Sequence, residues 1–378
     1  MTETVFRNAQ VVLPGEVVTG SVLVRDGIIA AIDTGASQHG EDLEGDYLIP
    51  GLVELHTDHL ENHYRPRPSV FWNPLGALQA HDTQIAGSGI TTVFDAVRIG
   101  SDPETPGMGD HVQVLVDAIA EGVADGRLRA DHLIHLRCEL PAHDVVADFE
   151  RFVDLPLVRL ASVMDHTPGE RQYQTVQKYI DYYKGRFNFS DAEMEAYMNE
   201  RIAEQALYSE PHRRAIVKRG LEAGIAFASH DDATQEHVEE SLADGVSIAE
   251  FPTTLLAAEA SHEAGLAVLM GAPNVVRGGS HSGNVSATDL AQHGWLDVLS
   301  SDYVPLALIH AAFILPLRAD NVSLPAAMAM VSATPAKAAH LTDRGEIATG
   351  KRADLVRVRL HGEMPVVRGV WRQGRRVS

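Results

Sequence analysis

LIPGLVELHTD, residues 48–58, is the stretch that decides the fold. Its apolar part is continuous, which is typical of a strand buried on both faces of a parallel sheet. It ends in the polar residues His56, Thr57 and Asp58. Residues two apart in a strand point to the same side, so His56 and Asp58 can face one metal ion. For an isolated H-x-D motif the alternative is a solvated hairpin.

Seven further apolar runs follow this one, and helical patterns separate them. The runs span residues 89–96, 132–140, 157–166, 225–232, 246–253, 266–274 and 296–303. Helices are expected over residues 108–121, 191–207, 212–223 and 234–244. Strands that alternate with helices indicate parallel βαβ units, and eight of them predict a distorted TIM (β/α)8 barrel. Residues 170–198 are polar and aromatic, and we interpret them as a helical excursion that forms either a lid or a dimer contact.

Both chain ends show a different pattern. Residues 1–48 and 345–378 contain short stretches that alternate apolar and polar residues around glycine-containing turns. Short strands need partners, so the two ends are expected to pair into one small β-sandwich domain. This assigns residues 49–344 to the barrel.

Composition excludes several classes of protein. The 378 residues carry a formal net charge of −21, which is a poor basis for binding nucleic acid through a general basic surface. No apolar run approaches the roughly 20 residues of a membrane span, and the first residues show no secretory signal pattern. The lone cysteine, Cys138, fits a reducing cytoplasm. We therefore expect a cytoplasmic protein with no nucleic-acid or membrane partner.

Polar clusters end most of the eight runs, where barrel enzymes carry their chemistry. The candidate metal ligands are His56, Asp58, Glu139, His166, His230 and Asp302. Imidazole and carboxylate ligands suit one or two divalent ions, with zinc first and manganese or iron as alternatives. Such an ion lowers the pKa of bound water from about 15.7 toward about 7, and Asp302 can take the proton. Taken alone, Glu139 is better interpreted as a residue that begins a loop or caps a helix.

These strand ends resemble the amidohydrolase superfamily, and the resemblance runs essentially from end to end. Its segments are residues 50–68, 88–100, 135–141, 163–172, 228–234, 249–254, 271–287 and 301–303, of which GAPNVVRGGSHSGN is the most specific. More closely, they resemble members of the superfamily that hydrolyse a ribosyl triphosphate in phosphonate catabolism. The superfamily's usual H-x-H motif has Asp58 at its second position here. No lysine stands where many members carry a carboxylated one, and Glu139 is the natural substitute.

The resemblance implies that water attacks the phosphorus nearest the ribose and that pyrophosphate leaves. A small-molecule substrate with this many negative charges needs cationic partners. Arginine is suited to bidentate contacts with phosphate. Candidate substrate-binding residues are His59, Arg65, Arg67, Arg171, Arg277 and His281. We also expect a homodimer, with other phosphonate-pathway proteins as further partners.

Two other functions remain open at this stage. The first is an amidohydrolase acting on a C–N bond, such as a deacetylase or a cyclic amidase, because the metal site would look the same. The second is a relative that has lost its metals and serves as a non-catalytic scaffold. Pyrophosphate release tests the first alternative, and metal analysis of the purified protein tests the second.

Overall fold

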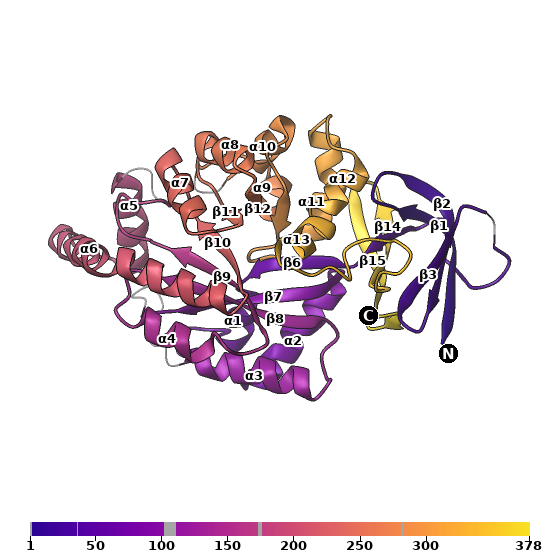
Figure 1. Ribbon diagram of the computed structural model, residues 1–378, viewed down its shortest axis with the longest axis horizontal. Helices are drawn as coiled ribbons and strands as arrows, with labels where there is room; N and C mark the ends of the chain where they lie inside the picture. Colours follow the sequence, from indigo (N-terminus) through magenta and orange to yellow (C-terminus); the bar gives the residue numbers. More distant parts are fainter. Residues whose placement is uncertain (1, 36, 102–110, 173–175, 281–282) are drawn as a thin grey trace. The chain divides into compact units, whose positions relative to one another are not determined.

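Eight parallel strands form the central sheet of the computed structural model, which describes residues 2–35, 37–101, 111–172, 176–280 and 283–378. Their bounds are β6 Leu52–Thr57, β7 Ile90–Ile99, β8 Asp131–Glu139, β9 Val158–Met164, β10 Ala226–His230, β11 Ile248–Glu250, β12 Ala267–Gly271 and β13 Val298–Ser300. The strands lie in the sheet in chain order, and an isolated parallel bridge joins Thr57, at the end of the first strand, to Asp302, just after the last. All eight predicted runs are confirmed, and so is the (β/α)8 barrel (Figure 1).

Helices follow the strands along the chain. They are α1 His59–Tyr64, α2 Pro74–Gly87, α3 Val112–Ala124, α4 Val145–Phe152, α5 Val176–Phe187, α6 Asp191–Glu222, α7 Gln235–Ala243, α8 Leu255–Glu263, α9 Ala272–Arg277, α10 Ala287–His293, α11 Leu306–Arg318, α12 Leu324–Ala329 and α13 Ala333–Ala338. Several begin at a Ser or Thr whose side chain accepts a backbone N–H of the first turn, as Thr234 and Thr254 do.

Helix α6 differs from the expectation of two helices over 191–207 and 212–223. It runs through Pro211 without a break. Proline removes the hydrogen bond to the carbonyl four residues earlier, at Leu207. Leu207 is 63% exposed, so solvent can satisfy that carbonyl and the helix continues.

The two chain ends pair with each other, as the sequence predicts, and their strands form one sheet. Its strands are β1 Glu3–Val12, β2 Val17–Arg25, β3 Ile28–Asp33, β4 Glu41–Asp42, β5 Tyr47–Pro50, β14 Leu355–His361, β15 Met364–Arg372 and β16 Arg375–Arg376. Strand β5 pairs with β14 antiparallel, which joins the N-terminal strands to the C-terminal ones (Figure 1). Phe6 packs edge-on against Trp371 in the core of this sheet, with ring centroids 4.7 Å apart.

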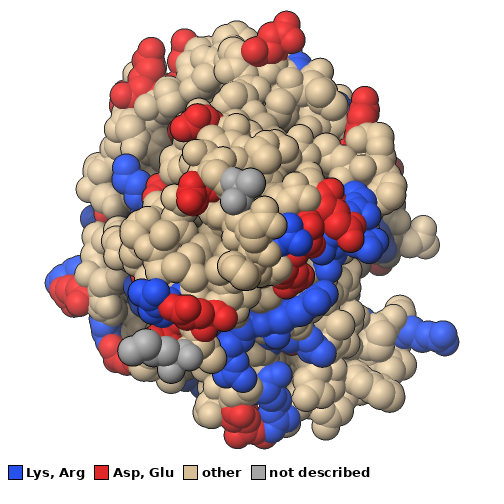
Figure 2. All heavy atoms as spheres, turned by 90° about the vertical axis from the view of Figure 1, so that its right-hand side faces the viewer, with Lys and Arg blue, Asp and Glu red and all other residues tan. Residues whose placement is uncertain are grey.

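The chain divides into two compact units. Unit 1 comprises Met1–Asp95, Asp117–Leu133 and Met270–Ser378, and unit 2 comprises Ala96–Val116 and Ile134–Leu269. No helix in the described part of the chain combines the length and apolar character that a membrane crossing requires. Figure 2 faces the side on which the terminal strands lie, and its basic side chains gather in the lower half with acidic ones beside them.

Candidate active site

In unit 1, the candidate site lies where β6 and β13 end. His56 is the penultimate residue of β6 and is buried, and Asp58 follows the strand. Asp302 comes two residues after β13, and its backbone N–H donates to the carbonyl oxygen of His56 over 3.2 Å. Asp302 has a φ of +55°, a conformation that non-glycine residues rarely adopt and that often marks functional sites. The structure thus brings together His56 and Asp302, which lie 246 residues apart in the sequence.

In unit 2, His166 and His230 follow or end the strands β9 and β10, and their rings lie 5.7 Å apart. Asp231 faces both of them. Its Oδ2 lies 3.4 Å from Nε2 of His230 and 3.9 Å from Nε2 of His166. One ligand atom from each of these three residues lies within 4.8 Å of the others, which is close enough for them to hold a metal ion. The sequence predicted the two histidines but did not include Asp231.

Each of these histidines has a carboxylate on its other ring nitrogen. Nδ1 of His166 lies 2.6 Å from Oε2 of Glu139, and Nδ1 of His230 lies 2.6 Å from Oε2 of Glu250. A carboxylate that accepts Nδ1–H leaves the Nε2 lone pair available, and metal-binding histidines are commonly oriented in this way. Residues His166, His230 and Asp231 therefore fit a divalent ion of the zinc class.

Glu250 was missed by the sequence analysis, although a signal was present. The sixth apolar run, like most of the others, has polar residues at its end, and Glu250 is the last residue of β11. Glu250 is buried, as a carboxylate can be when it is hydrogen-bonded. Its partner His230 is 20 residues earlier, and only the parallel pairing of β10 with β11, which sets His230 opposite Glu250, reveals the contact.

The Glu139–His166 contact also shifts the pKa values of both side chains. Burial alone would raise the pKa of Glu139, but the charge and hydrogen bonds of His166, together with Arg98, lower it to about 2. Burial would lower the pKa of His166, but the charge and hydrogen bond of Glu139 raise it. Glu139 additionally accepts the backbone N–H of His166 over 3.1 Å, so it fixes both the ring and the main chain of that residue.

The excursion at residues 170–198 contributes to a small hollow beside this pair. The hollow has a volume of about 20 Å³, and its lining includes Glu139, His166, Tyr179, Tyr183 and Tyr197. The tyrosines come from α5 and α6 and pack together, with Tyr179 stacked on Tyr183 at a centroid distance of 4.2 Å. The excursion therefore forms part of the wall around the Glu139–His166 pair.

The predicted substrate-binding residues differ in their exposure and in their contacts. Arg65 lies with its guanidinium carbon 5.8 Å from the centre of the Phe71 ring, and Arg67 is exposed. Arg277 ends α9 and is exposed.

Arg171, in contrast, is buried and ion-paired with Asp232 and Glu240, so its charge is already balanced. That makes it a weaker candidate for phosphate than Arg65 or Arg67. His59 shares a hydrogen bond with Gln84 over 2.9 Å. His281 lies outside the described residues.

A second buried group of titratable residues lies in unit 1, behind α2. His132 contacts Asp95 over 2.7 Å and Asp82 over 3.4 Å, and His81 contacts Asp95 over 2.8 Å. Burial alone would lower the pKa of His132, but the two carboxylates raise it to about 9. This arrangement is a charged hydrogen-bond network that ties α2 to β7 and β8.

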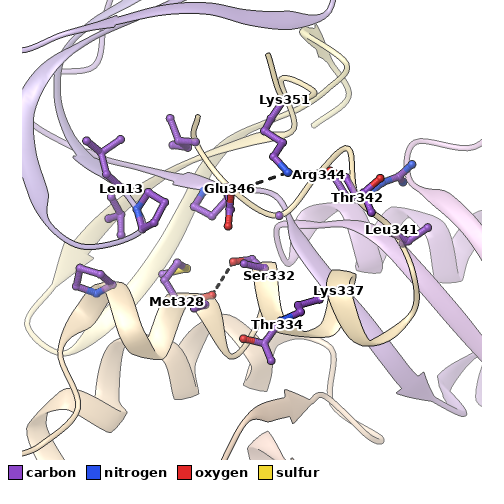
Figure 3. A pocket seen from close by; sticks show the side chains of 18 residues that line it. Leu13, Met328, Ser332, Thr334, Lys337, Leu341, Thr342, Arg344, Glu346 and Lys351 are labelled. Atoms are coloured by element: carbon purple, nitrogen blue, oxygen red, sulfur yellow. Dashed lines mark hydrogen bonds and ion pairs between the residues drawn. The ribbon is translucent and has the colours of Figure 1, made fainter. Parts of the chain in front are cut away.

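A roomier cavity of unit 1, of about 460 Å³, does not contain any of the predicted site residues (Figure 3). Its walls include Leu13 and Met328, and its polar groups include Lys351, whose ammonium lies 4.0 Å from Glu346. Pro50, which precedes β6, also lines it, so the cavity adjoins the amino end of that strand. Barrel enzymes carry their chemistry at the carboxyl ends of the strands, so the strand-end residues, and not this cavity, remain the candidate active site.

Comparison with known proteins agrees with this fold. The model of the amidohydrolase family matches residues 192–378. The chain belongs to the amidohydrolase family. It is 47% identical to the alpha-D-ribose 1-methylphosphonate 5-triphosphate diphosphatase of Escherichia coli (strain K12) over 376 residues, 99% of this chain and 100% of that protein.

Two solved structures show the same fold at low identity. The N-acetyl-D-glucosamine-6-phosphate deacetylase of Mycobacterium smegmatis matches with a TM-score of 0.63 and 16% identity, over 100% of both chains. The 5-methylcytosine deaminase of Klebsiella pneumoniae matches with a TM-score of 0.65 and 14% identity, over 99% of this chain and 98% of that one.

Proposed function

We propose that this protein is a metal-dependent hydrolase that cleaves alpha-D-ribose 1-methylphosphonate 5-triphosphate to the 5-phosphate and pyrophosphate. The observation that carries the proposal is the 47% identity, over essentially both whole chains, to a diphosphatase of that name. The strand-end histidines and carboxylates support it, because hydrolysis of a phosphoric anhydride calls for an activated water and a proton acceptor.

The proposed metal ligands are strand-end residues. They are His56, Asp58, Glu139, His166, His230 and Asp302, to which the geometry of unit 2 adds Asp231. Bound there, one or two divalent ions, with zinc as the first candidate, would acidify the attacking water and offset phosphate charge. Glu139 and Glu250 hold the rings of His166 and His230 by their Nδ1 atoms. Asp302 accepts the proton of the attacking water.

The substrate's remaining charge requires cationic side chains. We propose Arg65, Arg67 and Arg277 for this task, because Arg171 is neutralised by two carboxylates. His59 and His281 are proposed as further substrate contacts. A homodimer in a reducing cytoplasm remains our expectation for the state in which the enzyme works.

Phosphorus NMR tests the reaction directly. Protein loaded with zinc is incubated with the ribosyl methylphosphonate triphosphate, and chelator-treated protein serves as the control. Stoichiometric pyrophosphate together with a new phosphate monoester, seen only with the metal-loaded protein, supports the proposal. An unchanged spectrum from protein that has its full metal content contradicts it, and would direct attention to C–N bond substrates such as N-acyl sugars.

A further inference from the structure

Glu54 is a buried acid that the proposed chemistry does not use. It lies on β6 two residues before His56, and its side chain is 0% exposed. Alternate residues of a strand share one face, so Glu54 and His56 point to the same side of β6. A carboxylate buried in this way must be satisfied by hydrogen bonds, and its donors show what it holds in place.

Among the described residues, the donors to Glu54 come from β6 and from the end of β13 with the residue that follows it. Oε1 of Glu54 accepts the backbone N–H of His56 over 2.7 Å and the hydroxyl of Ser300 over 2.8 Å. Oε2 accepts the backbone N–H of Ser301 over 2.5 Å. Strand β13 ends at Ser300, so one carboxylate joins β6 to the end of β13.

Ser300 extends the network to Asp302. Its hydroxyl oxygen lies 2.6 Å from the carbonyl oxygen of His56 and accepts the backbone N–H of Asp302 over 3.3 Å. Asp302 adopts a φ of +55° just after β13, where an isolated bridge to Thr57 pairs its main chain with β6. Such a conformation persists only where the surroundings fix it, and the bonds of Glu54 and Ser300 add to the fixation that this bridge provides.

We propose that Glu54 is a positioning residue that, through Ser300 and Ser301, fixes the spacing between the proposed ligand His56 and the proposed base Asp302. The inference rests on the proposed function, since it assigns those two roles. Glu54 itself touches neither metal nor substrate. It acts through the main chain of both residues, so its loss should affect metal binding and turnover more than substrate binding.

Glu54→Gln tests the proposal. The carboxamide nitrogen of glutamine is a donor and cannot accept the N–H of Ser301. The bond between Glu54 and Ser301 is therefore lost, and two N–H groups face each other in its place. Loss of an orienting partner typically lowers metal affinity or activity by about 10- to 100-fold. We expect kcat to fall by about that factor, KM to change by less than about two-fold, and the zinc concentration that gives half of the metal-induced rise in Tm to increase about ten-fold.

Two buried serines, Ser300 and Ser261, supply a matched pair of variants. Ser300→Ala removes the hydroxyl that bonds Glu54, and should reproduce the effects of Glu54→Gln. Ser261→Ala is the control. Ser261 is buried on α8, and among the described residues its hydroxyl has no hydrogen-bond partner, so kcat and the zinc dependence should stay within about two-fold of wild type.

The outcomes separate this inference from the proposed function. If the wild type releases no pyrophosphate, the proposed function fails, and the zinc dependence of Tm still tests Glu54. If the wild type is active and both Glu54→Gln and Ser300→Ala match it in kcat and zinc dependence, the positioning role is overturned. Equal losses in Ser300→Ala and Ser261→Ala also overturn it, because they indicate general sensitivity to the loss of a buried hydroxyl. If Glu54→Gln does not fold, the pair of serine variants decides.

Discussion

The backbone N–H of Asp302 donates to the carbonyl oxygen of His56 over 3.2 Å, and this bond is one of those that hold the residues after β13 beside the end of β6. This main-chain contact fixes the positions of the backbone atoms from which the side chains of His56 and Asp302 extend. A carboxylate two residues beyond β13 is therefore held next to the first predicted metal ligand, which is the place that a proton acceptor for the attacking water requires.

Asp302→Asn should separate proton transfer from metal binding. The carboxamide keeps the size and the backbone contacts of Asp302 but cannot take a proton, so turnover should fall by about 100- to 10,000-fold. Metal content should remain near that of the wild type, because the other proposed ligands are intact. Pyrophosphate release and elemental analysis of the same samples measure both quantities. Wild-type turnover in this variant would remove Asp302 from the role of base.

Glu250→Gln should weaken metal binding in unit 2. Glu250 accepts Nδ1–H of His230 over 2.6 Å, and a carboxamide is a weaker acceptor that also offers competing donors. Loss of such a partner typically costs about 10- to 100-fold in metal affinity or activity. Competition with a coloured zinc chelator measures the affinity. Glu263→Gln, at an exposed position on α8, is the control and should leave the affinity unchanged; an equal loss in that variant would show that the effect is not specific to Glu250.

Asp95→Asn should destabilise the fold in a pH-dependent manner. Asp95 is buried against His132, and removal of one partner of a buried pair typically costs about 3–5 kcal/mol. The pKa of His132 is raised to about 9 in the folded protein, whereas an unfolded histidine has a pKa near 6.5. The Asp95–His132 pair therefore contributes fully to the free energy of unfolding below pH 6.5, and this contribution is lost as the pH rises through 9.

The free energies of unfolding of the wild type and Asp95→Asn should therefore differ most at pH 6 and converge toward pH 10. Urea denaturation at both pH values measures the difference. Asp125→Asn, on the surface, should cost less than about 0.5 kcal/mol at either pH. A gap that is constant from pH 6 to pH 10 would contradict a charged His132.

Asp46→Asn should weaken the terminal sheet in the opposite pH range. Asp46 contacts Nε of Arg357 over 2.5 Å and Nε of Arg359 over 2.6 Å. Burial alone would raise the pKa of Asp46, but the bonds to the two arginines lower it. The ion pairs of Asp46 therefore stabilise the fold fully above the pKa of an unfolded aspartate, which is about 3.9, and this stabilisation is lost as the pH falls below it.

We expect Asp46→Asn to lose about 1–3 kcal/mol of unfolding free energy at pH 7, and much less at pH 3. Urea denaturation at the two pH values is the measurement. Asp320→Asn, at an exposed position, should match the wild type at both. Equal losses for Asp46→Asn at pH 7 and pH 3 would show that packing, and not the charge of Asp46, makes the contribution.

The sequence by itself determined the barrel and predicted much of the proposed site. Strands buried on both faces must be continuously apolar, so each of the eight strands could be predicted from its own residues, without knowledge of its neighbours in the sheet. Because parallel strands place their functional residues at their carboxyl ends, His56, His166 and His230 could be predicted from the ends of those runs. The pairing of the two chain ends followed from the need of short strands for partners.

Only the tertiary structure decided which groups share a contact. The hydrogen bonds of Glu250 to His230 and of Glu54 to Ser300 depend on strand register, and those of Arg171 to Asp232 and Glu240 depend on how helices pack after the strands. No local pattern encodes these distances, since each pair lies between 20 and 246 residues apart. A charged residue at a strand end looks the same in the sequence whether it binds a ligand, orients a ligand or neutralises a neighbour. Its partner in space makes the difference.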